Sequence, residues 1–176
     1  MTFRSSLRWA LAFGLTIGAP PVCASQPGPR TLTETAGPFH LTAAPLRIAL
    51  PVNASMRAAL EQSNETTVYL VVRGLRARHE PGTTFALYVG LPETSSAEER
   101  QVHRIGSLNF FGIADQPTND REGSAWRSFE LPRRQVLVNG RLDASIAITI
   151  EANGAPAAEA EATIDSIAIV QSSPAR

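Results

Sequence analysis

The stretch "ASIAITIEA", residues 144–152, decides the fold class. Within it, isoleucines alternate with smaller or more polar residues: Ile146, Ile148 and Ile150 against Ala147, Thr149 and Glu151. Successive side chains of a β-strand point to opposite faces of a sheet, whereas a helix face needs apolar residues three or four positions apart. The alternation therefore predicts a strand with one face in a core.

Six further segments carry similar short apolar runs, separated by turn sequences such as "EPGT" and "ANGAP". They are residues 39–52, 66–75, 83–92, 102–113, 125–132 and 161–171. Pro45 interrupts the first, which predicts an edge or a broken strand. In the last, the spacing of Ile164, Ile167 and Ile169 predicts a bulge near Asp165. The one predicted helix is short and covers residues 54–62.

About seven short strands with little helix predict an all-β, antiparallel and jelly-roll-like β-sandwich. In 66–75, one face carries Val68, Leu70 and Val72, and the other carries Tyr69, Val71 and Arg73. The sandwich is predicted to occupy residues 39–171. A flexible leader of residues 25–38, rich in Pro, Gly and Thr, is predicted before it, and a frayed tail of residues 172–176 after it.

Residues 1–24 have the pattern of a secretory signal peptide, with Arg4 and Arg8 before the apolar run "WALAFGLTI" and small residues up to Ala24. The run is shorter than the ~20 residues that span a bilayer, so we expect no membrane span and an exported protein, periplasmic or secreted. Lipidation of Cys23 is the alternative, but "PPV" precedes it where a lipoprotein signal has Leu and small residues. An ordinary cleavage leaves no cysteine for disulfides, thiolate metal sites or nucleophilic catalysis.

The charge pattern excludes some classes of partner. Every basic residue is arginine, and losing Arg4 and Arg8 with the signal takes the formal net charge from zero to about −2. The sequence has neither a basic stripe nor an acidic block. Nucleic acid and anionic membrane surfaces are therefore not expected partners.

Catalytic and metal-binding patterns are missing from the sequence. His40, His79 and His103 stand apart from one another and from acidic clusters, so we expect no metal site. The nucleophile pattern "GxSxG" and the nucleotide-binding glycine motifs do not occur. A calcium loop formed by Asp115, Asp120 and Glu122 is an alternative to a solvated loop, but EF-hand spacing is lacking. We expect no catalytic residue, cofactor or metal, and no enzymatic activity.

Two adjacent phenylalanines, Phe110 and Phe111, are the candidate partner contact. In one interpretation, Phe110 enters the core, and Phe111 covers a sheet edge or packs under the loop of residues 115–124, with Gly112 permitting the turn. In the other, an aromatic side chain at the strand end projects into a partner as an anchor. The sequence favours the first interpretation, because loops often cover the second face of a strand.

The segments "TTVYLVVRGLRARHEPGTTFALYVGLP", "RIGSLNFFGI" and "ATIDSIAIV" are similar to the C-terminal domain of polyphenol oxidases and bacterial tyrosinase-like proteins. The resemblance extends from Phe39 to Val170. In that family the domain usually follows a copper domain with two groups of three histidines, which this chain lacks. Oxidase activity is therefore not implied. The resemblance implies a β-sandwich that packs over the mouth of a type 3 copper centre and shields it or helps it mature.

Two functions are expected from these observations. The first is a non-catalytic, exported accessory domain of a tyrosinase-like copper protein. Copper delivery is disfavoured because the mature chain has no cysteine, scattered histidines and Met56 as its one methionine. The alternative is an exported binding module for a carbohydrate or cell-envelope ligand. An exposed row of Trp and Tyr on one sheet would favour it, and burial of Tyr69 and Tyr88 would weaken it.

Overall fold

The computed structural model describes residues 28–61, 67–113, 125–137 and 142–172. Eight strands in these residues form two antiparallel four-stranded sheets, β1-β8-β3-β6 and β2-β7-β4-β5, which we call the β1 sheet and the β2 sheet. The strands are β1 Arg30–His40, β2 Leu46–Pro51, β3 Thr67–Leu75, β4 Phe85–Val89, β5 Arg104–Leu108, β6 Ala125–Glu130, β7 Ser145–Ala152 and β8 Thr163–Ser172.

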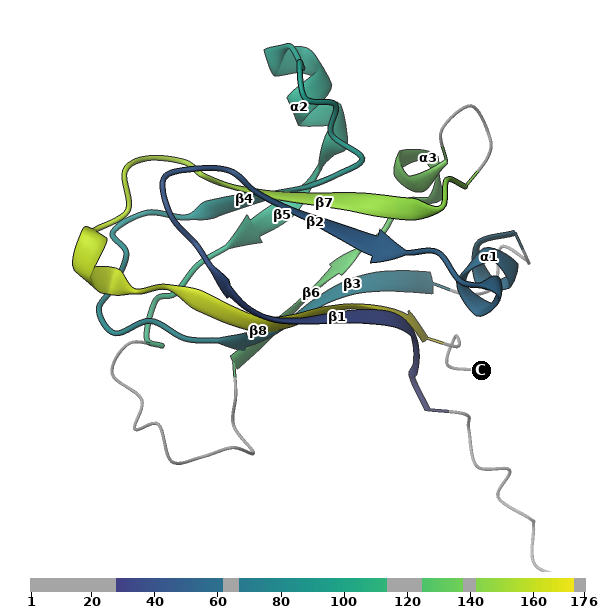
Figure 1. The fold of residues 1–176 in the computed structure, drawn as a ribbon, viewed down its shortest axis with the longest axis horizontal. Helices are drawn as coiled ribbons and strands as arrows, with labels where there is room; N and C mark the ends of the chain where they lie inside the picture. The colour runs from purple at the N-terminus through teal and green to yellow at the C-terminus, as the bar shows by residue number, and fades with distance from the viewer. Residues whose placement is uncertain (1–27, 62–66, 114–124, 138–141, 173–176) are drawn as a thin grey trace, which may run out of the picture.

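The two sheets face each other as the layers of a sandwich (Figure 1). Neighbours within a sheet are never consecutive in the chain except β4 and β5, so the chain repeatedly crosses from one sheet to the other. This strand order is that of an eight-stranded jelly roll. The predicted all-β antiparallel sandwich is confirmed.

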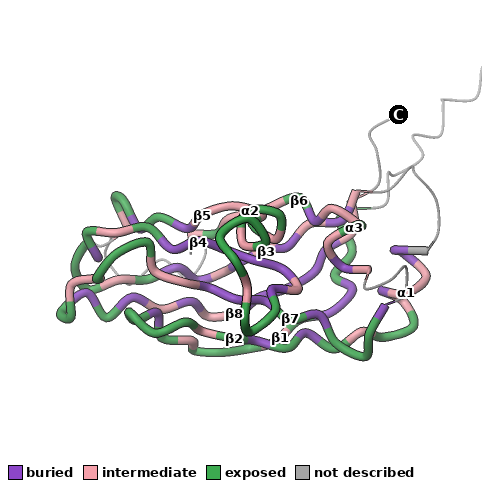
Figure 2. The backbone as a smooth tube through the Cα atoms, turned by 90° about the horizontal axis from the view of Figure 1, so that it is seen from above, coloured by how far each residue is buried: buried purple, intermediate pink, exposed green. Residues whose placement is uncertain are grey.

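The core lies between the sheets, where the predicted apolar faces meet. Figure 2 shows buried positions alternating with more exposed ones along the strands. From the β2 sheet, Ile148 is fully buried and pairs with Ile48 on β2 and Val89 on β4. From the β1 sheet, Leu70 and Val72 are fully buried. The predicted division of β3 and β7 into an apolar and a more polar face is confirmed, because apolar burial drives each strand to one register.

Strand β1 begins at Arg30, so the predicted flexible leader of residues 25–38 is wrong from residue 30 onward. Only Leu32 and Thr33 in this strand are buried. The strand is held by backbone pairing with β8, from Arg30 opposite Gln171 to His40 opposite Thr163. Backbone pairing of this kind leaves no hydrophobic period in the sequence, so the sequence did not predict β1. The predicted single broken strand of residues 39–52 is the end of β1 followed by β2, which makes eight strands rather than seven.

The predicted irregularity near Asp165 is confirmed. The register of β1 with β8 shifts between Ala36 and Phe39, which lie opposite Ser166 and Ile164. Regular pairing of β3 with β8 also ends at Ser166. The step of three residues on β1 lies opposite a step of two on β8, so the extra residue belongs to β1. On β8, Ile164 and Ile167 are both fully buried although they are three positions apart.

The predicted helix is confirmed as α1, Ala54–Glu61. Asn53 caps it, because its Oδ1 accepts a hydrogen bond from the backbone N–H of Met56 at 2.8 Å. Its Nδ2 donates to the carbonyl of Leu32 at 2.6 Å, which ties the helix to β1. Three further short helices were not predicted: α2 Ala97–His103, α3 Arg133–Val136 and the 3-10 turn η1 Ala158–Ala160.

We expect Asn53→Ala to lower the free energy of unfolding by about 2 kcal/mol, since it removes a helix cap worth about 1 kcal/mol and a second hydrogen bond of similar worth. Asn53→Ser keeps a capping oxygen but cannot reach Leu32, so it should lose about half as much. Urea denaturation followed by circular dichroism measures both. An alanine variant as stable as the parent would show that neither contact matters.

Candidate functional site

The two adjacent phenylalanines have opposite environments. Phe110 is 2% exposed, and its ring meets the ring of Phe85 edge to face, with centroids 5.7 Å apart. Phe111 is 82% exposed. The backbone N–H of Ile113 donates to the carbonyl of Phe110 at 3.0 Å, and Gly112 has φ +71°. This is a tight turn whose third residue must be left-handed, a conformation that glycine adopts without strain. Phe111 therefore stands at the corner of the turn.

The predicted burial of Phe110 is confirmed, but the structure leaves Phe111 exposed rather than covering a sheet edge. The loop of residues 115–124, under which Phe111 was also predicted to pack, lies outside the described residues. A shallow hollow of about 210 Å³ adjoins Phe111. Its other wall is the segment between β3 and β4, including Glu80, Pro81 and Thr83. An exposed ring beside a hollow is the arrangement of an apolar contact surface rather than of a catalytic site.

The histidines do not gather. The Nδ1 of His103, at the end of α2, lies 2.8 Å from the carbonyl of Val89 at the last residue of β4. His79 precedes the first residue of β4 and its backbone N–H donates to Ala160. Their contacts thus lie on different elements, β4 for His103 and η1 for His79. Among the described residues, no group of three His, Cys, Asp or Glu side chains could hold a metal ion. The proposed calcium loop at residues 115–122 lies outside this part of the chain.

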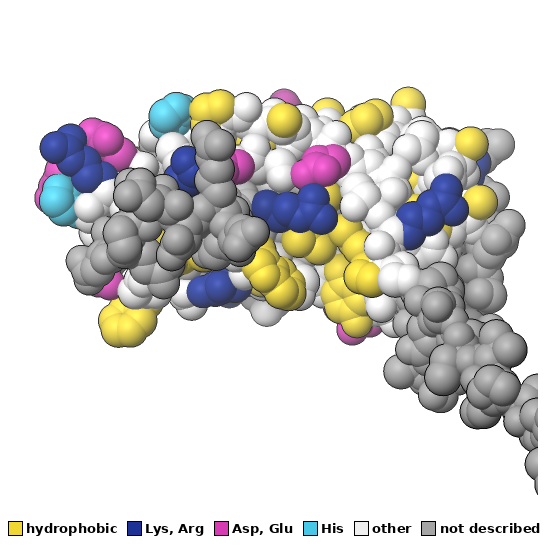
Figure 3. Space-filling view, turned by 90° about the horizontal axis from the view of Figure 1, so that it is seen from below, with side chains coloured by type: hydrophobic (Ala, Val, Ile, Leu, Met, Phe, Trp, Pro, Cys, Tyr) yellow, Lys and Arg dark blue, Asp and Glu magenta, His cyan; other side chains and the backbone are white. Residues whose placement is uncertain are grey.

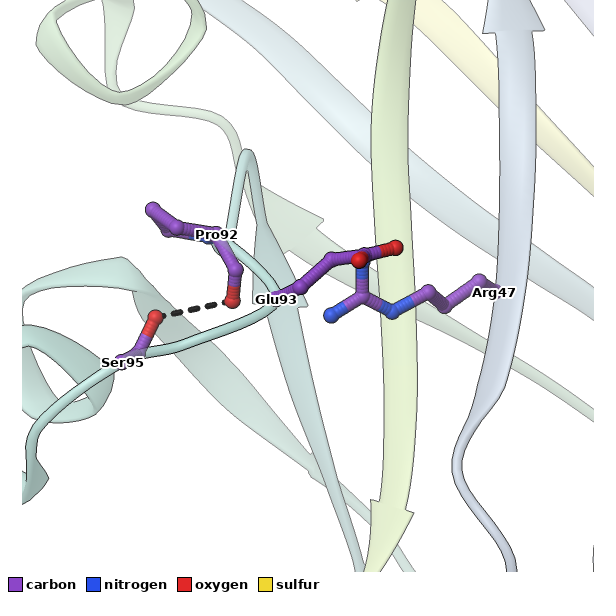
Figure 4. A network of polar contacts seen from close by, with 4 residues as sticks. All are labelled: Arg47, Pro92, Glu93 and Ser95. Atoms are coloured by element: carbon purple, nitrogen blue, oxygen red, sulfur yellow. Dashed lines mark hydrogen bonds and ion pairs between the residues drawn. The ribbon is translucent and has the colours of Figure 1, made fainter.

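The segment between β4 and β5, which contains α2, lies on the outer side of the β2 sheet and covers part of that face (Figure 1). Beneath it, Tyr88 is 8% exposed and Thr149 is fully buried. Arg100 from α2 forms an ion pair with Glu151 on β7. Arg47 on β2 reaches across β7 to Glu93, with Nη1 and Oε1 3.3 Å apart, and the Ser95 hydroxyl donates to Pro92 within the segment (Figure 4). The segment thus covers β4 and the neighbouring part of β7, whereas Ala49 and Ala147 on the same face stay exposed.

A capping box starts α2 within this covering segment. The Ser96 hydroxyl accepts from the backbone N–H of Glu99, and the Glu99 carboxylate accepts from the backbone N–H of Ser96. Hydrogen bonds from its own backbone N–H and then from the Ser96 hydroxyl hold the pKa of Glu98 below its ordinary value. The sequence pattern Ser96-x-x-Glu99 is a helix-start signal that would have predicted α2 instead of a turn.

The outer face of the β1 sheet is open, and sequence reasoning did not single it out as a site. Tyr69 is half-buried there, and Trp126 is 59% exposed on the edge strand β6. Burial of both tyrosines was expected to weaken the alternative of a binding module. Tyr88 is buried, but Tyr69 is only half-buried. Pairing of β3 with β6 places Arg73 directly opposite Trp126. The alternation of side chains along a strand predicted that Tyr69 and Arg73 share a face. Only the register of β6 against β3 shows that Trp126 lies on the same face.

Comparison with known proteins finds similarity at the level of the fold. Residues 24–172 match the family described as "Domain of unknown function (DUF7868)". No curated protein matches the chain. A recombinantly expressed latent aurone synthase, a polyphenol oxidase, is 15% identical with a TM-score of 0.54, over 81% of this chain and 27% of that chain. A latent aurone synthase from natural source is 14% identical with a TM-score of 0.52 and the same coverage. The chain thus spans about a quarter of these enzymes.

Among helices of the described residues, none combines the length and the apolar character that crossing a bilayer requires. In the part of the chain that the structure describes, two surfaces carry a large exposed aromatic ring. One is the turn of Phe111 at an end of the sandwich, and the other is the outer face of the β1 sheet.

Proposed function

Since the chain belongs to the DUF7868 family of domains of unknown function, we propose its function from its fold and surface: a non-catalytic, exported accessory domain of a tyrosinase-like copper protein. The exposed ring of Phe111 carries this proposal, because it stands free at one end of a jelly roll that recurs within polyphenol oxidases. An aromatic side chain held out on a tight turn is suited to insert into a recess of a partner.

The fold likeness supports the choice of partner. In the aurone synthases the similar region is about a quarter of the chain, and both structures are described as latent. The sequence resemblance assigns this region to the domain that shields the copper centre. In the proposal, this chain supplies that domain as a separate protein, and Phe111 enters the mouth of the copper site of its partner.

Export is part of the proposal. It is supported by Arg4, Arg8 and the short apolar run before Ala24, and by the family match, which begins at residue 24. Both proteins would then meet in the periplasm or outside the cell.

The test uses the chain from Ser25 onward, mixed with the tyrosinase-like protein of the same organism. We expect the two to co-elute in size-exclusion chromatography and phenol oxidation to change, with and without added copper. Phe111→Ala should weaken the complex at least about ten-fold, the effect of losing an aromatic anchor at an interface.

Trp126→Ala is the matched control, because it removes the other exposed aromatic ring from a different face. It should leave the complex and the oxidation rate unchanged. A folded chain that neither co-elutes nor alters phenol oxidation would overturn the accessory role. Equal effects of the two variants would show that Phe111 is not the anchor.

A further inference from the structure

A groove crosses the outer face of the β1 sheet. It has a volume of about 460 Å³, and most of the residues that line it come from β3, β6 and β8, among them Tyr69, Val71, Arg73, Trp126, Ser128 and Val170. Figure 3 shows this face, on which hydrophobic side chains gather next to arginines. The groove is distinct from the turn of Phe111, and the accessory role makes no use of it.

The groove results from the alternation of side chains along each strand and from the register of β6 against β3. Tyr69, Val71 and Arg73 share the outer face of β3, and β6 places Ser128 opposite Val71 and Trp126 opposite Arg73. With a rise of ~3.3 Å per residue, the four-residue offset puts the two aromatic side chains ~13 Å apart along the strands. An aromatic side chain thus stands toward each end of the groove, with Val71 between them, and Val170 on β8 adds apolar surface directly opposite Tyr69.

The groove carries no uncompensated charge. Arg73 is the only charged residue among those that line it in the described chain, and its Nη1 lies 2.9 Å from Oε1 of Glu34. The Ser166 hydroxyl donates to the same Glu34 oxygen at 2.7 Å. What remains for a ligand is neutral. The hydroxyl of Tyr69 and the indole N–H of Trp126 make no hydrogen bond with any other described residue, and the Ser128 hydroxyl lies between them along the groove.

Aromatic faces combined with neutral hydrogen-bonding groups fit a sugar ring. The C–H face of a pyranose is apolar and packs flat on an aromatic ring, while its hydroxyl groups project from the edge. The groove is open along the sheet, so it cannot enclose most of the surface of a small ligand as compact pockets do. An open, flat site instead suits successive units of an extended chain.

We propose that the outer face of the β1 sheet binds a neutral, extended β-1,4-linked glycan. One sugar ring stacks on Trp126 and another on Tyr69, and Arg73 and Ser128 donate hydrogen bonds to hydroxyl groups between them. An anionic ligand is disfavoured because Glu34 already compensates Arg73. A second copy of the chain fits poorly, since a symmetric contact would set one hollow against another and leave a void.

The chain offers a direct probe of this site. Trp126 is the only tryptophan after the predicted signal peptide, which contains Trp9. We expect cellohexaose or chitohexaose, both neutral β-1,4-linked hexasaccharides, to change the tryptophan fluorescence of the chain from Ser25 onward in a saturable way. Calorimetric titration of the same hexasaccharides then compares the variants, including those without tryptophan.

Trp126→Ala should weaken hexasaccharide binding at least about ten-fold, by analogy with the lower range for a base stacked on an aromatic side chain. Tyr69→Ala should weaken it similarly, whereas Phe111→Ala should bind as the parent does. Circular dichroism shows whether each variant is folded. The proposal is overturned if neither hexasaccharide binds the folded parent, or if Trp126→Ala binds equally well. It is also overturned if sedimentation shows self-association that Trp126→Ala abolishes.

Discussion

Phe110→Ala is expected to lower the free energy of unfolding by about 3–5 kcal/mol, because it empties a fully enclosed aromatic site in the core. The ring is 2% exposed and loses its edge-to-face contact with Phe85. Neighbouring core strands cannot close a cavity of this size without distorting the sheets. Chemical denaturation should show a lower midpoint with an unchanged slope. For a domain with an ordinary unfolding free energy of about 5–15 kcal/mol, this is at least about a fifth of the total.

Phe111→Ala is the matched control, because the same substitution one residue later removes a ring that is 82% exposed. Its effect on the free energy of unfolding should stay within about 0.5 kcal/mol. The pair therefore separates structure from function: one phenylalanine stabilises the sandwich, and its neighbour is free to contact a partner. Similar losses for both variants would mean that Phe111 is buried in solution.

The sequence predicted the parts of the fold that depend on apolar burial. In β7, Ile146, Ile148 and Ile150 are buried in the core and alternate with residues of the outer face. The strand lies between β2 and β4 in its sheet. The same logic located the irregularity at Asp165, because a break in the alternation of a strand shifts the next buried isoleucine by one position. Burial leaves a period in the sequence, and that period can be read directly.

The sequence did not predict what depends on pairing between distant segments. β1 has few buried residues and exists because β8 offers it unpaired backbone groups. The groove depends on the register that sets Trp126 opposite Arg73, across more than fifty residues of chain. Neither relation leaves a local pattern. The exposed state of Phe111 depends likewise on how distant segments pack around the turn, so the sequence alone left two interpretations open.

Gly74→Ala is expected to lower the free energy of unfolding by about 2–5 kcal/mol, for two reasons that add. Gly74 has φ +67°, and a left-handed conformation costs an alanine about 1–2 kcal/mol. A β-carbon built there would also lie 2.5 Å from Cβ of Asp165 and closer still to its carboxyl group. The carboxylate is held by Arg76 at 2.7 Å, and its Cβ cannot rotate away, so the backbones of β3 and β8 must separate at the irregularity. Crowding of this kind costs about 1–3 kcal/mol.

Gly82→Ala isolates the conformational part of that loss. Gly82 has nearly the same φ, +68°, but a β-carbon there would meet nothing within 4 Å. Its variant should therefore lose only the left-handed strain of about 1–2 kcal/mol. The difference between the two variants, measured by urea denaturation under one condition, gives the cost of the contact with Asp165. If both variants lose the same free energy of unfolding, β3 and β8 separate at Asp165 without a cost. The close packing of β3 on β8 there would then not contribute to stability.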